Sequence, residues 1–279
     1  MPPIRHLAIV VNAQKAGAAE IANDLTAIAQ AAKVQVTQTQ QFPVPIDFFT
    51  PVDACCAIGG DGTLLGIARS AAEAGVPIIG VNRGSLGFLT TFSAEEARTH
   101  LAALLQGHFD IAERALLDCS TEPDHHDLAL NDVLIKDENH SRLVELSVHA
   151  NNELVTTYTC DGLLFSSPTG STAYNLSAGG PLIHPDAEVI ALTPICPHTL
   201  SNRSIIFRQD VKLRVTPRRR DTCLLVAIDG QRNICICEGG AVEITVSPRR
   251  LKLINRASYE HFSVVRTKLK WSGGVTTGH

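Results

Sequence analysis

The chain has 279 residues, of which 44% are hydrophobic, and its 24 Lys and Arg residues nearly balance its 28 Asp and Glu residues. This length suits one large domain or two ordinary ones, with enough apolar sequence for packed cores. The small net charge of −4 and the scattered basic residues argue against a nucleic-acid partner or a membrane surface. Because the N-terminus lacks a leader pattern and no apolar run could cross a membrane, we expect a cytoplasmic protein.

The eight cysteines include no Cys-x-x-Cys pair. Cys55 and Cys56 are adjacent within an apolar run, whereas Cys235 and Cys237 have the spacing of residues on one face of a strand. We therefore expect buried, reduced thiols in place of a disulfide framework or a zinc site.

The first part of the chain alternates apolar runs with helical periodicity. Buried strands are expected at residues 6–11, 34–39, 54–58 and 76–81. Helices are expected at about 18–32, from a glycine turn to about Ala74, and from Ser93, where Glu96 completes a capping box. This alternation predicts a parallel sheet covered on both faces, with ligands beyond the carboxyl ends of its strands.

A glycine-rich turn, Gly59-Gly60-Asp61-Gly62-Thr63, joins the third of these strands to its helix. The backbone N–H groups of this turn can approach an anion. A helix that begins here with Thr63 as N-cap adds further N–H donors and the positive end of its dipole, so phosphate is the expected ligand. An acid in such a site indicates either a metal ligand or a proton acceptor, both of which belong to phosphoryl transfer. The alternative is a tight turn in which the carboxylate hydrogen-bonds its own backbone.

Two further polar segments follow strand ends at the same predicted rim of the sheet. Asn12 follows the first strand, and residues 82–89 (Asn-Arg-Gly-Ser-Leu-Gly-Phe-Leu) follow the fourth. We expect both to lie beside the glycine turn.

After about Asp110 the sequence changes to short β-rich segments, which indicates a second domain. Strands are expected at residues 115–120, 127–135, 143–148, 153–159, 163–166, 211–215, 223–228, 233–237 and 241–246. Their density predicts two β layers. Within this domain, residues 167–180 are small, hydroxylated and glycine-rich, and Tyr174 offers a ring for stacking, as a nucleotide site requires.

Helical periodicity returns near the C-terminus. Its apolar stripe comprises Tyr259, Phe262, Val265, Leu269 and Trp271, and we expect this helix to pack back on the first domain. The predicted fold is thus α/β plus all-β. A Rossmann-like parallel α/β domain comprises residues 1–112 and 257–279, and a β-sandwich domain comprises residues 113–256.

Several blocks, in this order and spacing, resemble the signature blocks of bacterial NAD kinases. They are residues 59–63, 82–89, 131–132, 161–162, 168–181 and 196–203, and the resemblance covers roughly residues 5–270. It implies transfer of a phosphoryl group from ATP or polyphosphate to the 2′-hydroxyl of the adenosine ribose of NAD, giving NADP. A divalent cation is implied as cofactor, with Mg²⁺ the expected ion. The glycine turn alone is less specific, because diacylglycerol-type lipid kinases and 6-phosphofructokinases carry similar turns.

The resemblance also assigns residues one at a time. Asp61 corresponds to the proton acceptor for the ribose hydroxyl and suits metal orientation equally, and no dedicated metal ligand is assigned. The implied nucleotide contacts are Gly60, Gly62, Thr63, Asn131, Asp132, Arg142, Asp161, Thr172, Ala173, Tyr174, Asn175, Leu176, Ser177 and Gln231. Without the resemblance, Asn131-Asp132, Asp161 and Gln231 would be interpreted as turns. Arg142 corresponds to a residue that meets the dinucleotide of a neighbouring subunit, which implies a homodimer or homotetramer.

One departure lies two residues before Asp161, where many bacterial members carry Arg or Lys and this chain has Thr159. A lost charge-assisted hydrogen bond to a dinucleotide phosphate would weaken NAD binding by about 1.5–3 kcal/mol, unless Arg142, His149 or His198 replaces it. Two other functions stay open. A diacylglycerol-type lipid kinase would need an apolar acceptor channel, and a non-catalytic NAD(P)(H) sensor would gain nothing from an acid beside phosphate.

Overall fold

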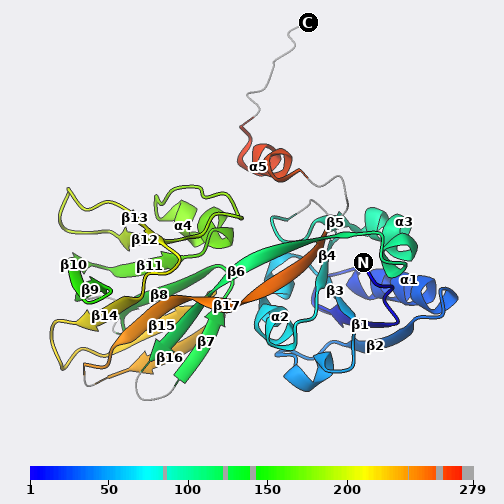
Figure 1. Cartoon of the computed structure of the whole chain (residues 1–279), viewed down its shortest axis with the longest axis horizontal. Helices are drawn as coiled ribbons and strands as arrows, with labels where there is room; N and C mark the ends of the chain where they lie inside the picture. The colour runs from blue at the N-terminus through cyan, green and yellow to red at the C-terminus, as the bar shows by residue number, and fades with distance from the viewer. Residues whose placement is uncertain (84–86, 122–124, 139–142, 238, 256–259, 272–279) are drawn as a thin grey trace, which may run out of the picture. The chain divides into compact units, whose positions relative to one another are not determined.

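The computed structural model describes residues 1–83, 87–121, 125–138, 143–237, 239–255 and 260–271. The chain forms two compact units, one of Met1–Ala112 with Lys252–His279 and one of Glu113–Leu251 (Figure 1). None of the helices in these residues is long and apolar enough to cross a membrane.

The first unit is built on a parallel sheet. Its strands β1 (His6–Val11), β2 (Gln35–Thr39), β3 (Ala54–Ile58) and β4 (Ile78–Asn82) lie in the order β4-β3-β1-β2. The end of β17 (Val242–Asn255) adds parallel to β4, and the short β5 (Phe92–Ser93) also pairs with β4. The predicted parallel α/β fold is confirmed.

Helices cover both faces of this sheet. α1 (Ala18–Ala31) and α3 (Ala94–Leu105) lie on one face and α2 (Asp61–Ala74) on the other, with the short η1 (Ile46–Phe49) beside α2 (Figure 1). Alternate β1 residues, among them Leu7 and Ile9, pack with apolar residues of α1 and α3. As predicted, α2 ends at Gly75, which has a left-handed φ of 72°.

The predicted capping box begins α3. The Ser93 hydroxyl accepts a hydrogen bond from the Glu96 N–H at 3.2 Å, and the Glu96 carboxylate accepts one from the Ser93 N–H at 2.9 Å. We expect Ser93→Ala to lower the free energy of unfolding by about 1 kcal/mol because an N-cap acceptor is lost. Ser93→Asp should retain most of the free energy of unfolding, because the aspartate carboxylate can also accept the N-cap hydrogen bond. Urea unfolding of both variants checks this, and equal losses would contradict the capping role.

The second unit contains two antiparallel β layers. In one layer the strand order is β13-β12-β11-β8-β15-β16, and in the other β10-β9-β14-β17, with β6 and β7 paired beyond β17. The bounds are β6 (Asp110–Thr121), β7 (His125–Ala129), β8 (Asp132–Asp137), β9 (Val144–Ala150), β10 (Glu153–Cys160), β11 (Gly162–Ser166), β12 (Val189–Ile195), β13 (Ile205–Arg208), β14 (Leu213–Pro217), β15 (Leu224–Ile228) and β16 (Arg232–Ile236). Their inward side chains, including Tyr158 and Phe165, share one core, which confirms the predicted β-sandwich.

Two strands of this unit were not predicted, and one predicted strand is divided. The expected strand at 127–135 is interrupted at Leu130 and Asn131, which separate β7 from β8. β12 was missed because it contains Pro194, which argues against a central strand. β13 pairs with β12 only at residues 189–192. On that side of β12, therefore, no strand needs a backbone hydrogen bond from Pro194.

The C-terminal helix α5 (His261–Leu269) belongs to the first unit, as predicted, but its expected apolar stripe is only partly buried. Val265 is buried, but Phe262 and Trp271 are 58% and 57% exposed. Trp271 leaves the stripe because Lys270, with a left-handed φ of 54°, ends the helix before it. Tyr259, the first residue of the predicted stripe, lies outside the described residues.

The cysteine prediction is correct in the first unit and, in the second, for the buried free thiols Cys119 and Cys160, but it is wrong for Cys223 and Cys237. Cys55 and Cys56 are fully buried free thiols, and burial raises the pKa of Cys56 to about 12. In contrast, Cys223 and Cys237 form a disulfide. The two cysteines are 14 residues apart in sequence. Cys223 directly precedes β15 and Cys237 directly follows β16, so the pairing of these strands places them opposite each other.

Candidate functional site

The glycine turn after β3 places Asp61 at the first residue of α2. Gly59 and Gly60 have φ values of 152° and 111°, which residues with a side chain rarely adopt. A Cβ on Gly59 would also overlap the Thr63 hydroxyl. The turn therefore needs these glycines, and it places here the positive dipole end of a 14-residue helix, which favours a bound anion.

Thr63 is not the N-cap of this helix, contrary to prediction. The N-cap is Gly60, which makes no side-chain capping bond, and the helix begins three residues earlier than expected. The Thr63 side chain is buried and accepts a hydrogen bond from the Asn12 side-chain amide at 3.2 Å. Asn12 and Thr63 thus join the carboxyl end of β1 to the start of α2.

The Asp61 carboxylate is held by the backbone that follows β4. Its Oδ2 accepts a hydrogen bond from the Phe88 N–H at 2.9 Å. Its Oδ1 accepts bonds from the Leu89 N–H at 3.2 Å, the Thr90 N–H at 2.9 Å and the Thr90 hydroxyl at 2.8 Å. Four donors on one carboxylate fix its orientation. This excludes the alternative in which Asp61 caps only its own turn.

Sequence reasoning placed residues 82–89 at this rim but did not identify residues 88–90 as partners of Asp61. A Cβ on Gly87 would overlap the Asp61 carboxylate, so the chain can approach the acid only with a glycine there. A glycine in a loop that follows a strand end is the signal that could have indicated this close approach.

In the second unit, the loop between β7 and β8 is organised by Asp229. The Asp229 carboxylate accepts hydrogen bonds from three successive N–H groups, those of Leu130 at 2.9 Å, Asn131 at 2.7 Å and Asp132 at 3.1 Å. The Asp229 N–H in turn donates to the Asp132 carbonyl at 2.9 Å. Asp229 was not predicted as a site residue, because it acts only through the backbone of the loop.

The Asp132 carboxyl is buried close to that of Asp229. Loss of hydration, with a smaller contribution from the negative charge of Asp229, raises the pKa of Asp132 to about 7. Burial also raises the pKa of Asp229, against the lowering effect of its three N–H donors. At neutral pH Asp132 can therefore either donate or accept a proton in a hydrogen bond with a ligand.

This raised pKa predicts a pH dependence of stability. Between about pH 4 and pH 7, native Asp132 holds a proton that the unfolded chain has lost, so stability falls as pH rises through this window and is constant above it. The neutral isostere Asp132→Asn should not show this loss. Urea unfolding of both proteins across the window measures it, and parallel pH profiles would contradict the raised pKa.

The segment that follows β11 packs on the same loop. The Ser167 N–H donates to the Asn131 carbonyl at 2.9 Å, and the Ser167 hydroxyl donates to the Leu130 carbonyl. Gly170 lies in the short helix η2 (Thr169–Thr172), and a Cβ on it would overlap the Asn131 carbonyl, so η2 can approach this loop only with a glycine there. The short helix α4 (Tyr174–Ser177) follows η2. The structure thus brings Asn131, Asp132 and residues 172–177 together within one unit.

These residues differ in how much of each side chain a ligand could reach. Tyr174 is 44% exposed and Ser177 is also exposed, while Thr172, Ala173 and Leu176 are partly buried. Asn175 is fully buried, and its amide donates to the Pro181 carbonyl at 3.0 Å and accepts from the Thr193 hydroxyl at 2.7 Å. Asn175 therefore supports this segment from inside the unit, although it was predicted as a ligand contact.

The remaining predicted residues lie at turns of the second unit. Asp161 is exposed between β10 and β11, and its carboxylate accepts a hydrogen bond from the Cys196 thiol, which raises the pKa of that thiol. Gln231 is exposed at the turn before β16. Arg142 lies outside the described residues.

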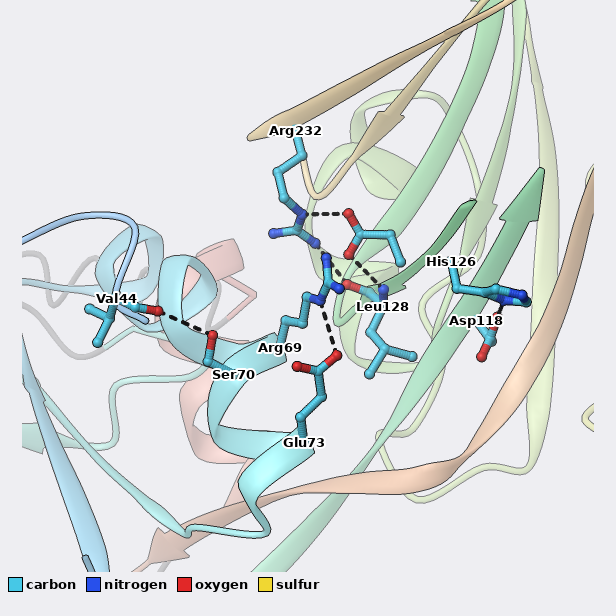
Figure 2. A network of polar contacts seen from close by, with 9 residues as sticks. Val44, Arg69, Ser70, Glu73, Asp118, His126, Leu128 and Arg232 are labelled. Carbon is cyan, nitrogen blue, oxygen red and sulfur yellow. Dashed lines mark hydrogen bonds and ion pairs between the residues drawn. The ribbon is translucent and has the colours of Figure 1, made fainter. Parts of the chain in front are cut away.

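An ion pair holds the β15–β16 hairpin that carries Asp229 and Gln231. The Arg232 guanidinium binds the buried Asp127 carboxylate at 2.8 Å and the Leu128 carbonyl at 2.8 Å (Figure 2). Arg232 thereby ties the first residue of β16 to β7, just before the loop that Asp229 organises.

Thr159, the departure from the family pattern, lines a cavity of about 240 Å³ within the second unit. Arg219 lines the same cavity, although the sequence analysis did not name it as a replacement cation. Its guanidinium is paired with the exposed Asp221 at 3.1 Å. The His198 N–H donates to the Thr159 carbonyl at 2.9 Å, so this histidine is held nearby by its backbone.

A glycine turn that places a helix N-terminus beside a fixed carboxylate is the kind of site found in phosphotransferases. The sequence patterns of the ATP-NAD kinase N-terminal and C-terminal domains match residues 48–109 and 130–256. The NAD kinase of Geobacter sulfurreducens is 40% identical over 82% of this chain and 82% of its own length. The NAD kinase of Syntrophobacter fumaroxidans is 35% identical over 96% of this chain and 99% of its own length. The chain therefore belongs to the NAD kinase family and is an enzyme.

Solved structures show the same fold. Yeast NADH kinase, complexed with NADH, superposes with a TM-score of 0.86 at 20% identity, over 99% of this chain and 90% of the yeast chain. An NAD kinase from Archaeoglobus fulgidus in complex with ATP gives a TM-score of 0.81 at 24% identity, over 95% and 98%.

Proposed function

We propose that the chain phosphorylates the 2′-hydroxyl of the adenosine ribose of NAD to give NADP, with ATP or polyphosphate as the phosphoryl donor. The observation that carries this proposal is the Asp61 carboxylate, held in a fixed orientation at the start of α2 within a glycine turn suited to phosphate. The family membership supports the choice of acceptor.

Asp61 is the proposed general base. The ribose oxygen attacks the terminal phosphorus of the donor, the bond from that phosphorus to the leaving phosphate oxygen breaks, and the hydroxyl proton passes to Asp61. Oδ2 is the better acceptor because it receives one hydrogen bond from the described residues, whereas Oδ1 receives three. The N–H groups of residues 88–90 keep Oδ2 in a fixed direction, so little reorganisation accompanies the transfer.

A divalent cation, with Mg²⁺ expected, fits this site only together with the donor. Within the described residues, no group of three His, Cys, Asp or Glu side chains surrounds Asp61. Mg²⁺ is commonly held by one or two carboxylates and by substrate phosphates, so Oδ2 of Asp61 could supply the protein's share. When bound, the ion neutralises charge on the transferring phosphoryl group.

The dinucleotide contacts proposed for the second unit are Asn131, Asp132, Asp161, Thr172, Ala173, Tyr174, Leu176, Ser177 and Gln231, with Asn175 in support; Gly60, Gly62 and Thr63 belong to the turn around Asp61. Polar groups dominate this set. A lipid acceptor would instead require an apolar channel, so the diacylglycerol-kinase alternative is disfavoured.

The test is incubation of the purified chain with Mg²⁺, ATP and NAD, with NADP detected by an NADP-specific dehydrogenase, beside a parallel reaction on diacylglycerol vesicles. NADP should form only in the complete mixture. Phosphorylated lipid without NADP would support a lipid kinase, and tight NAD binding without turnover under any donor or metal would support a sensor.

We further propose a homodimer or homotetramer, on the family correspondence of Arg142 to a residue that reaches a neighbouring subunit. Light scattering with and without NADP should give a mass of at least two chains. A fully active monomer would contradict it.

A further inference from the structure

A cluster of sulfur and carboxylate groups lies on the second unit, at strand ends that carry none of the proposed nucleotide contacts. β8, β15 and β16 are neighbours in one sheet, and Glu138, Cys223 and Cys237 occupy adjacent positions just beyond their paired residues. The Glu138 N–H donates to the Cys223 carbonyl at 3.0 Å, which fixes this row. Cys235 lies two residues before Cys237 and so on the same face.

This row lies on the outer face of the sheet. Leu224 and Ile236 are buried in the core, whereas the flanking Cys223 is partly buried and Cys235 and Cys237 are exposed. A ligand could therefore reach all three sulfur atoms from solvent.

Three of the four groups lie within the span of one metal ion, and the fourth, Cys235, lies beside one of the three, Glu138. The ligand atoms of Glu138, Cys223 and Cys237 all lie within 4.8 Å of one another. The Cys235 sulfur is 3.6 Å from the Glu138 carboxylate. In a tetrahedral zinc site with Zn–S of about 2.3 Å and Zn–O of about 2.0 Å, the ligand atoms are roughly 3.3–3.8 Å apart.

We propose that reduction of the Cys223–Cys237 disulfide creates a binding site for a thiophilic divalent cation, formed by Cys223, Cys235, Cys237 and Glu138. Zn²⁺ matches this donor set because it accepts thiolates and carboxylates together in a tetrahedral arrangement, whereas Mg²⁺ and Ca²⁺ prefer oxygen ligands. The disulfide and the metal site are alternative states of the same two cysteines.

The chemistry balances with a thiol or phosphine reductant. Two electrons and two protons convert the disulfide into two thiols, and the reductant is oxidised to its disulfide or phosphine oxide. Binding of the cation then releases the three thiol protons to solvent as thiolates form. Lys136 lies in the same cross-strand row as Cys235, separated from it by Leu225.

The experiment titrates the full chain with Co²⁺, as a spectroscopic substitute for Zn²⁺, after reduction with a phosphine under anaerobic conditions. We expect a thiolate-to-cobalt charge-transfer band that saturates at a single ion per chain and is removed by Zn²⁺. The oxidised chain should give no such band, because two of its ligands are joined to each other.

Matched substitutions separate this cluster from the other cysteines. Cys235→Ser should weaken binding by more than about 100-fold, the upper end of what loss of a supporting residue does. Cys196→Ser removes another exposed thiol outside the cluster and should leave the band unchanged. The proposal is overturned if the reduced chain gives no thiolate band, if Cys235→Ser binds as tightly as the parent chain, or if Cys196→Ser abolishes binding.

Discussion

Replacing Asp61 by Asn is expected to lower kcat by about 10²–10⁴-fold, the usual contribution of a general base. The amide cannot accept the ribose proton at neutral pH. The dissociation constant for NAD should change little, because the substitution removes a negative charge from a phosphate site and adds no bulk. The measurement is kcat beside a calorimetric dissociation constant for NAD.

From the structure we also expect Asp61→Asn to have a lower free energy of unfolding. With Asn, the side-chain oxygen can still accept from Leu89 and Thr90, but the amide nitrogen faces the Phe88 N–H, so that donor loses its acceptor. Thermal unfolding must therefore show that the variant is folded at the assay temperature. Asp24→Asn is the matched control, since Asp24 lies on α1 and pairs with Arg98 at the surface. A fall in kcat of less than about tenfold in folded Asp61→Asn would assign Asp61 a structural role in the turn alone.

Replacing Asp229 by Ala is expected to destabilise the second unit by about 3 kcal/mol or more and to raise the KM for NAD. Three backbone N–H groups in the loop at Asn131 lose their acceptor, and each unsatisfied buried donor costs about 1–3 kcal/mol. Relief of the burial of the Asp229 charge, and of its repulsion of Asp132, offsets part of this loss. The cost of the three unsatisfied N–H donors still dominates, so the loop should no longer hold Asn131 and Asp132 in place.

Urea unfolding and NAD titration of Asp229→Ala measure both effects. The control is Asp221→Ala, which removes an exposed acid from the turn at the other end of β15 and should be close to neutral. If Asp229→Ala unfolds at the urea concentration of the control and binds NAD equally well, the loop is not organised by Asp229.

The α/β architecture could be predicted because each element carries its own signal. The apolar runs of β1, β3 and β4 alternate with helices that have clear caps, such as Gly75 at the end of α2 and the Ser93–Glu96 box at the start of α3. β12 was missed because the effect of Pro194 depends on the length of its neighbour β13, which is a tertiary property. The Cys223–Cys237 disulfide likewise depends on the register of β15 and β16, which no local pattern of cysteines reveals.

The position of Asp61 could be predicted from its glycine turn, but the groups that hold it could not. Residues 88–90 act through backbone N–H groups, which any residue type except proline supplies, and only Gly87 marks their approach. Asp229 was overlooked for the same reason, since its partners are N–H groups about 100 residues earlier in the chain. Side-chain chemistry is visible in a sequence, whereas the backbone partners of a side chain become visible only in the fold.

The most direct test of the proposed reaction is the position of the new phosphate in the product. After incubation of the chain with NAD, ATP and Mg²⁺, phosphorus and proton NMR of the purified dinucleotide should place the added phosphoryl group on the 2′-oxygen of the adenosine ribose. Product with the phosphate on another oxygen, or no phosphorylated dinucleotide from a folded chain saturated with NAD and ATP, would contradict the account.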